Sequence, residues 1–274
     1  MSKINSLIAE RMSLIKPSPT MAVSKLAAEM KAAGKDVIGL GAGEPDFDTP
    51  DHIKNAAITA IKNGETKYTA VDGTPALKKA IVNKFYKDNN IEYKIDEIIV
   101  SVGGKQVLFN ALMSSINPGD EVIIPAPYWV SYPDMVALAG GIPIIVEGKE
   151  SNNFKVIPDD IKNKISDKTK WIIINSPSNP TGSSYTKNEL KDLGNLLLNY
   201  ENIFIMSDDI YEKIIYDDFK FYSLAEVVPA LKDRILTVNG VSKAYAMTGW
   251  RIGYAGGPKE LISSMAKLQS QSTS

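Results

Sequence analysis

Seven short apolar runs alternate with segments of helical periodicity, and this alternation constrains the fold more than any other feature of the sequence. The runs lie at residues 98–102, 121–124, 142–146, 171–174, 203–206, 235–238 and 251–255. Helical periodicity falls between several of them, at residues 106–116, 130–139, 187–200 and 259–268. Short buried strands joined by helical crossovers predict a mostly parallel, seven-stranded sheet with helices on both faces, which is a three-layer α/β/α domain.

The part of the chain before the first of these runs is less regular. Three helices are predicted there, at residues 21–33, 50–62 and 74–89. The first of them ends at Gly34, as helices often do. Residues 36–40 predict a short strand that runs into a turn-rich loop. We expect this start to form an N-terminal arm.

Charge and composition restrict the binding partners and the catalytic groups that are expected for this chain. Lysine and arginine number 31 against 32 acidic residues, so no basic excess indicates nucleic acid or an anionic membrane as a partner. The chain has no cysteine and one histidine, His52, which excludes disulfides, thiolate metal sites and a cysteine nucleophile. No apolar run is long enough to span a bilayer, and the charged start lacks the apolar region of a signal peptide, so a cytoplasmic protein is expected.

Ligands of such sheets bind beyond the carboxyl ends of the strands, so the residues after each run are the candidates for a site. After the first run, Gly103 and Gly104 directly precede a predicted helix. Free backbone N–H groups and the helix dipole at that point can hold a phosphate. A tight turn between strand and helix is the alternative, because the spacing fits neither a Walker loop nor the dinucleotide fingerprint.

Three later strand ends add side chains that can hold a flat, polar ligand. Trp129 follows the second run, where an aromatic face can stack on a ring or simply pack locally. Asn179 lies between two X-Pro bonds after the fourth run, in a rigid turn that presents its amide. Asp208 and Tyr211 follow the fifth run, and a buried Asp208 needs a partner such as a protonated heterocyclic nitrogen. A metal held with Asp209 is less favoured, since neighbouring strand residues point to opposite faces.

A reactive amine comes after the sixth run. Lys243 is followed eight residues later by Arg251. Burial or a nearby positive charge such as Arg251 lowers the pKa of a lysine, and a lysine of lowered pKa can condense with a carbonyl to form a Schiff base. A phosphate cradle, an aromatic ring, an amide, a buried carboxylate, a tyrosine and this amine follow strands in order. Together they predict pyridoxal 5'-phosphate as the cofactor.

The same stretches resemble the class I aminotransferases of fold type I, and within them the aspartate/prephenate branch. The matching stretches run in family order: AGEPDFDTP (42–50), TKYT (66–69), VGGKQ (102–106), PYWVSYP (127–133), NSPSNPTG (175–182), SDDIYE (207–212) and SKAYAMTGWRIGY (242–254). The resemblance implies the fold of the pyridoxal-phosphate transferases and a homodimer. It divides the chain into an N-terminal arm with part of a small domain, residues 1–45, and a cofactor-binding large domain, residues 46–274.

The resemblance also implies a role for each candidate residue. Lys243 would form the Schiff base and then move the proton, as base and as acid, while Asp208 would keep the pyridine nitrogen protonated. Trp129 would stack on the ring. The other implied cofactor contacts are Asn179 and Tyr211 at the phenolic oxygen, and Gly104, Lys105, Ser242, Arg251 and, from a partner subunit, Tyr68 at the phosphate.

Substrate contacts are implied at Gly43, Trp129, Asn179, Lys105 and Lys16. In this branch a lysine matching Lys105 is associated with the distal carboxylate of aspartate, and one matching Lys16 with prephenate. Family members continue into a region that completes the small domain and supplies an arginine for the substrate α-carboxylate. We therefore expect a C-terminally truncated aminotransferase whose small domain is incomplete.

The predicted activity is transfer of the amino group of aspartate to a 2-oxo acid by a ping-pong Schiff-base mechanism, with glutamate or prephenate-linked substrates as further candidates. Two alternatives stay open. One is a lyase of the same fold and cofactor, and the other is a truncated cofactor-binding fragment with little activity. The prediction includes no metal, no nucleic acid and no membrane.

Overall fold

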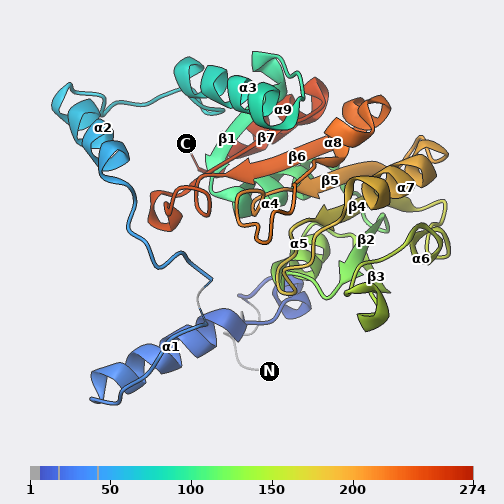
Figure 1. The fold of residues 1–274 in the computed structure, drawn as a ribbon, viewed down its shortest axis with the longest axis horizontal. Coiled ribbons are helices and arrows are strands. Elements are labelled where there is room, and N and C mark those ends of the chain that lie inside the picture. Colours follow the sequence, from blue (N-terminus) through green and yellow to red (C-terminus); the bar gives the residue numbers. More distant parts are fainter. Residues whose placement is uncertain (1–6, 18, 42, 274) are drawn as a thin grey trace.

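All seven predicted strands form one sheet in the computed structural model, which describes residues 7–17, 19–41 and 43–273 (Figure 1). The strands are β1 (Ile98–Val102), β2 (Glu121–Ala126), β3 (Ile142–Glu147), β4 (Thr169–Asn175), β5 (Phe204–Asp208), β6 (Ile235–Gly240) and β7 (Ile252–Gly256). Their order across the sheet is β1-β7-β6-β5-β4-β2-β3. The pairs from β3 to β6 are parallel, and β7 is antiparallel to both of its neighbours. The prediction of a mostly parallel sheet is confirmed.

Helices cover both faces of this sheet. The helices are α1 (Pro19–Ala32), α2 (Asp51–Lys62), α3 (Pro75–Asn89), α4 (Gly104–Ser115), α5 (Ser131–Leu138), α6 (Pro158–Lys162), α7 (Lys187–Leu198), α8 (Leu224–Val227) and α9 (Lys259–Gln269). One core cluster joins the sheet to α3, α6, α7 and α8, and a second joins it to α4, α5 and α9. The three-layer α/β/α architecture is therefore confirmed.

Alternation along the strands explains why two cores form. Ile98 and Ile123 belong to the first cluster, whereas Ile99 and Ile124 belong to the second, and all four are fully buried. Successive side chains of a strand point to opposite faces, so a continuous apolar run supplies both cores at once.

Residues 36–40 do not form the predicted strand. They have no regular secondary structure and pair with no strand in the described structure, and the side chains of Ile38 and Leu40 are 85% and 89% exposed. A strand needs a partner to receive its backbone hydrogen bonds, and the described part of the chain offers these residues none. The apolar pattern of residues 36–40 does not show that a partner strand is missing.

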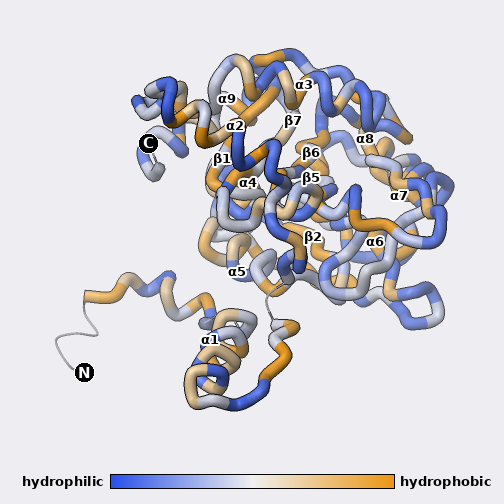
Figure 2. The backbone as a smooth tube through the Cα atoms, turned by 60° about the vertical axis from the view of Figure 1, so that its left-hand side comes forward, coloured by the Kyte–Doolittle hydropathy of each residue, from blue (hydrophilic) through white to orange (hydrophobic). Residues whose placement is uncertain are grey.

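The N-terminal helices are the least buried part of the structure. No residue of α1 or α2 is buried, and α1 lies apart from the layers of the sheet (Figures 1 and 2). Hydrogen bonds nevertheless tie the following loop to the body, because Thr49 Oγ1 donates to the carbonyl of Ala246 at 2.6 Å and accepts from Trp250 Nε1 at 3.0 Å. No helix within residues 7–17, 19–41 and 43–273 has the length and apolar character to cross a membrane.

Candidate active site

A cavity of about 610 Å³ lies at the carboxyl edge of the sheet. Six strands run towards this edge and the antiparallel β7 starts from it, so residues directly before β7 meet those that follow the other strands. Ten of the predicted site residues line the cavity: Gly43, Gly104, Lys105, Trp129, Asn179, Asp208, Tyr211, Ser242, Lys243 and Arg251. The fold thus brings together residues spread over more than 200 positions of the sequence.

Lys243 reaches this cavity from the turn that follows β6. Its Nζ donates to the carbonyl oxygen of Gly43 and lies 5.8 Å from the centre of the Tyr211 ring. Burial lowers the pKa of Lys243, the charge of Glu44 opposes that effect, and the positive charge of Arg251 adds to it. A lowered pKa makes more of the amine available as a nucleophile or base near neutral pH.

Asp208, the last residue of β5, carries a buried carboxyl that faces the cavity. Burial raises its pKa to about 6, against two hydrogen bonds that lower it, from the Tyr132 hydroxyl and the Ile210 backbone. The hydroxyl of Tyr132 donates to Asp208 Oδ2 at 2.6 Å, and the Ile210 N–H donates to Oδ1 at 3.4 Å. In the described part of the chain no cationic side chain pairs with this carboxyl. It therefore suits a ligand that brings its own positive charge, as a protonated pyridine nitrogen does.

Asn179 and Tyr211 lie side by side near Asp208. The amide Nδ2 of Asn179 donates to the Tyr211 hydroxyl at 3.3 Å. Asn175, the last residue of β4, joins the two strand ends: its Nδ2 donates to the Asp208 carbonyl at 2.9 Å and its Oδ1 accepts from the Asn179 N–H at 2.7 Å. These bonds hold the backbones of Asp208 and Asn179 in place relative to each other.

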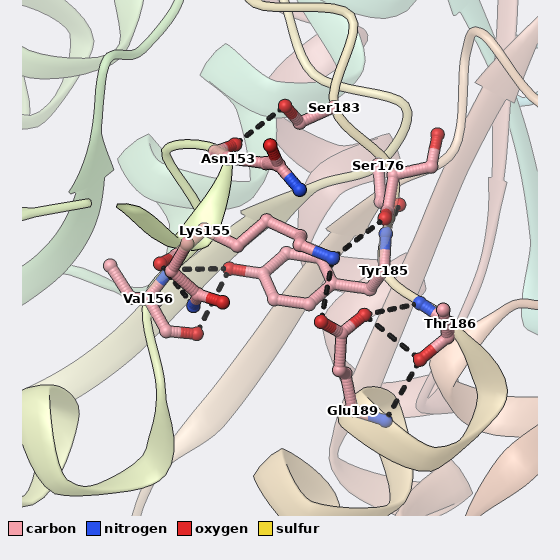
Figure 3. A network of polar contacts seen from close by, with 10 residues as sticks. Asn153, Lys155, Val156, Ser176, Ser183, Tyr185, Thr186 and Glu189 are labelled. Carbon is pink, nitrogen blue, oxygen red and sulfur yellow. Dashed lines mark hydrogen bonds and ion pairs between the residues drawn. The ribbon is translucent and has the colours of Figure 1, made fainter. Parts of the chain in front are cut away.

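A polar network lies behind the loop that carries Asn179 (Figure 3). Lys155 Nζ pairs with Glu189 Oε1 at 2.6 Å, at the start of α7. Ser183 Oγ donates to the carbonyl of Asn153 at 2.6 Å, and the Tyr185 N–H donates to Ser176 Oγ at 3.1 Å. In Figure 3, Asn153 and Lys155 come from the segment after β3 and Glu189 comes from α7, whereas Ser176, Ser183 and Tyr185 belong to the loop itself. The loop is thus held by a bond to Asn153 after β3 and by bonds within the loop, in addition to the bond between Asn175 and Asn179.

The start of α4 and Arg251 form the positively polarised side of the cavity. Gly103, with φ of 78°, caps a helix whose first turn has no acidic residue. Arg251, in the left-handed region with φ of 58°, donates through Nη1 to the Thr248 carbonyl at 2.7 Å. Free N–H groups at a helix start and a guanidinium are together suited to a phosphate.

Lys105 and Trp129 border the same side. Lys105 Nζ lies 4.8 Å from the centre of the Trp129 ring. Burial, and secondarily the charge of Arg251, lowers the pKa of Lys105. A cation over an aromatic face gives the cavity both a flat surface and a positive charge that can meet an anionic group of a substrate.

Two predicted site residues lie elsewhere, and two neighbours were missed. The side chain of Tyr68 is fully exposed, and Lys16 is also exposed, so neither lines the cavity of this chain. Tyr132 and Asn175 were not predicted as site residues, although both line the cavity. Both belong to stretches quoted for the resemblance, but only the fold shows which groups they contact.

No cluster of three or more potential metal ligands occurs among the residues that the structure describes.

Comparisons with known proteins show the family to which the chain is similar. The family model described as aminotransferase class I and II matches residues 35–274. The chain is 63% identical over 269 residues to the probable aspartate/prephenate aminotransferase of Rickettsia typhi, covering 98% of this chain and 67% of that protein. It is 57% identical to the aspartate/prephenate aminotransferase of Cereibacter sphaeroides, with the same coverage.

Solved structures show the same relationship in three dimensions. The aspartate aminotransferase from Rhizobium meliloti matches with a TM-score of 0.94 and 54% identity, over 97% of this chain and 67% of that one. The aspartate aminotransferase from Thermus thermophilus with maleate matches with a TM-score of 0.93 and 45% identity, over 97% and 68%. The chain thus spans about two thirds of the length of these relatives.

Proposed function

The chain belongs to the class I and II aminotransferases, a family of enzymes that use pyridoxal 5'-phosphate, and from this premise we propose that the cavity at the carboxyl edge of the sheet is its active site. The observation that carries the proposal is the convergence of one amine, Lys243, one buried carboxyl, Asp208, and one anion-binding corner at Arg251 on a single cavity. The cofactor requires an amine to react with its carbonyl, a carboxylate to pair with its ring nitrogen and a positively charged corner to bind its phosphate.

When bound, the cofactor supplies a carbonyl carbon for amine exchange and a ring that accepts electrons. We assign to Lys243 Nζ the roles of covalent attachment and of proton acceptor and donor, since burial lowers its pKa. Asp208 holds the positive charge of the ring nitrogen. The other assigned cofactor contacts are the phosphate-binding Gly104, Lys105, Ser242 and Arg251, and the ring-orienting Trp129, Asn179 and Tyr211.

Aspartate is the substrate that we propose, because the relatives are named aspartate/prephenate or aspartate aminotransferases. Lys105 provides a positive charge at the cavity for the distal carboxylate, and Gly43, Trp129 and Asn179 complete the assigned contacts. A role of Lys16 towards prephenate stays a prediction from the sequence, since Lys16 lies outside the cavity.

We also propose a homodimer in which Tyr68 of one copy reaches the cofactor of the other. The full exposure of Tyr68 and the absence of any buried residue in α2 support a contact with a second copy. The division into an arm with part of a small domain, residues 1–45, and a large domain, residues 46–274, is likewise proposed, and the separate position of α1 supports it. A cytoplasmic location stays a prediction.

The test is a pair of half-reactions with the purified chain loaded with pyridoxal 5'-phosphate. Aspartate alone should convert the cofactor to its amine form and release one equivalent of oxaloacetate, and 2-oxoglutarate should restore the carbonyl form and yield glutamate. Lys243→Ala should abolish both. Alanine and carbon dioxide in place of oxaloacetate would show a lyase instead, and cofactor binding without any of these products would show a binding fragment.

A further inference from the structure

A hydrogen bond between two buried side chains lies in the wall of the proposed cofactor site. The Tyr132 hydroxyl donates to Asp208 Oδ2 at 2.6 Å, and the two residues are 2% and 5% exposed. They are 76 positions apart in the sequence, one on α5 and the other at the end of β5. A short bond from a hydroxyl to a carboxylate is among the stronger hydrogen bonds of a protein interior.

Packing holds the Tyr132 ring in place. It meets the Trp129 ring edge-on, with centroids 5.4 Å apart and an interplanar angle of 86°. On the same helix, Met135 and Val136 are buried in the core that α5 shares with the sheet. The hydroxyl is therefore delivered by a side chain with little freedom to turn away.

The surroundings of Asp208 leave it dependent on this donor. Tyr132 from α5 and Tyr211 from the segment after β5 are the titratable groups that act on it, and β4 contributes only the neutral Asn175. Lys243 and Arg251 line the same cavity and approach it from the segment between β6 and β7. Burial pushes the pKa of Asp208 up, and the hydroxyl of Tyr132 pulls it back.

We propose that Tyr132 is a positioning residue for Asp208: its hydroxyl engages Oδ2, keeps the carboxyl ionised, and leaves Oδ1 for the protonated ring nitrogen of the cofactor. Oδ1 has only the 3.4 Å contact from Ile210 among the residues described. The inference rests on the proposed function, since it takes Asp208 as the partner of that nitrogen. It adds a residue that acts through Asp208 without contacting the reacting atoms.

The experiment measures the dissociation constant of pyridoxal 5'-phosphate between pH 5.5 and 8.5 for the full chain and for Tyr132→Phe. Loss of the donor raises the pKa of Asp208, so affinity should fall about tenfold at pH 6.5 and less than about threefold at pH 8.5. The matched control is Tyr93→Phe, which removes a buried hydroxyl 2.9 Å from Thr237 in the other core and should change neither value. Thermal melting verifies that each variant is folded.

Two further variants separate this inference from the proposed function. In an Asp208→Asn background, Tyr132→Phe should add no pH-dependent loss. Tyr132→Gln, which is too short to keep the contact, should show the same loss at low pH as Tyr132→Phe. If Tyr132→Phe lost the same cofactor affinity at every pH, or lost none, the role of Tyr132 would be overturned. This holds even if Asp208→Asn weakens cofactor binding. Unchanged affinity in Asp208→Asn itself would overturn the role of Asp208, and with it that of Tyr132.

Discussion

Gly103 lies so close to Arg251 that a β-carbon at position 103 would stand 2.2 Å from Arg251 Nη2. The guanidinium occupies the space that any larger residue would need. Gly103 also has φ of 78°, a backbone conformation that disfavours side chains. A single glycine therefore lets the start of α4 and the residue before β7 share one corner of the cavity, where we place the phosphate.

Gly103→Ala should displace the Arg251 side chain and weaken the binding of pyridoxal 5'-phosphate by about tenfold or more, because one charge-assisted contact is worth about 1.5–3 kcal/mol. The change should also cost about 1–3 kcal/mol of stability through backbone strain. Titration of cofactor absorbance and urea unfolding measure the two effects. Gly119→Ala is the control, since Gly119 has φ of 94° with no atom within 4 Å of the added carbon, and it should lose stability only. Equal loss of affinity in both variants would contradict the account.

Glu44→Gln should lower the pKa of Lys243 further. The carboxylate of Glu44 stabilises the charged form of this lysine, so its removal favours the neutral amine. Glutamine can still accept the hydrogen bond that Thr248 Oγ1 donates to Glu44 at 3.0 Å. The rate of cofactor condensation should therefore reach its half-maximal value at a lower pH than in the unchanged chain. Asp46→Asn, in the same loop, should leave the midpoint in place, and an upward shift in Glu44→Gln would refute the reasoning.

Asp209→Asn should flatten the dependence of stability on pH. Burial raises the pKa of Asp209 to about 8, from its ordinary value of 3.8. Between these values the folded state binds more protons than the unfolded state, so the stability contributed by this residue is complete below about pH 4 and is lost as the pH rises through 8. Asparagine cannot ionise, so the fall in unfolding free energy from pH 5 to pH 8 should be smaller. The exposed Asp167→Asn is the control and should retain the full fall.

Lys84→Met should destabilise the fold by about 3 kcal/mol, because it leaves the buried carboxylate of Glu212 without its cation. Asn89 Nδ2, which donates to Glu212 Oε2 at 2.9 Å, cannot supply the missing charge. Urea unfolding measures the change. Lys25→Met breaks an ion pair with Glu29 in which the Lys25 side chain is 80% exposed and the Glu29 side chain 60%. This substitution should have far less effect on stability. Similar losses in the two variants would show that burial does not set the importance of the Lys84 pair.

The strands were predictable because each one contains a short apolar run, and in β4, β5 and β6 nearly every residue is buried. Each of the seven strands predicted for the sheet begins within two residues of the observed one. The segment at residues 36–40 has the same apolar character but no partner strand in the described structure. A local sequence pattern does not show whether a second strand is available to pair with it. Helices α6 and α8, of five and four residues, are too short to show helical periodicity, and the sequence did not predict them.

The lining of the site was predictable because parallel strands bring their carboxyl ends to one edge. Ten predicted residues meet at the cavity for this reason. Tyr132 escaped prediction because its role depends on which way α5 turns, and the close approach of Gly103 to Arg251 depends on the antiparallel direction of β7. Tyr68 is fully exposed and lines no part of the cavity of its own chain, so its assigned contact needs a second copy.

The most direct test of the central claim is the site of covalent attachment. The chain is incubated with pyridoxal 5'-phosphate, reduced with borohydride and digested, and the labelled peptide is identified by mass spectrometry, with Lys243→Arg treated in parallel. The account predicts one label per chain, on Lys243, and none on Lys243→Arg. A label spread over exposed lysines, or an equal yield from Lys243→Arg, would contradict it.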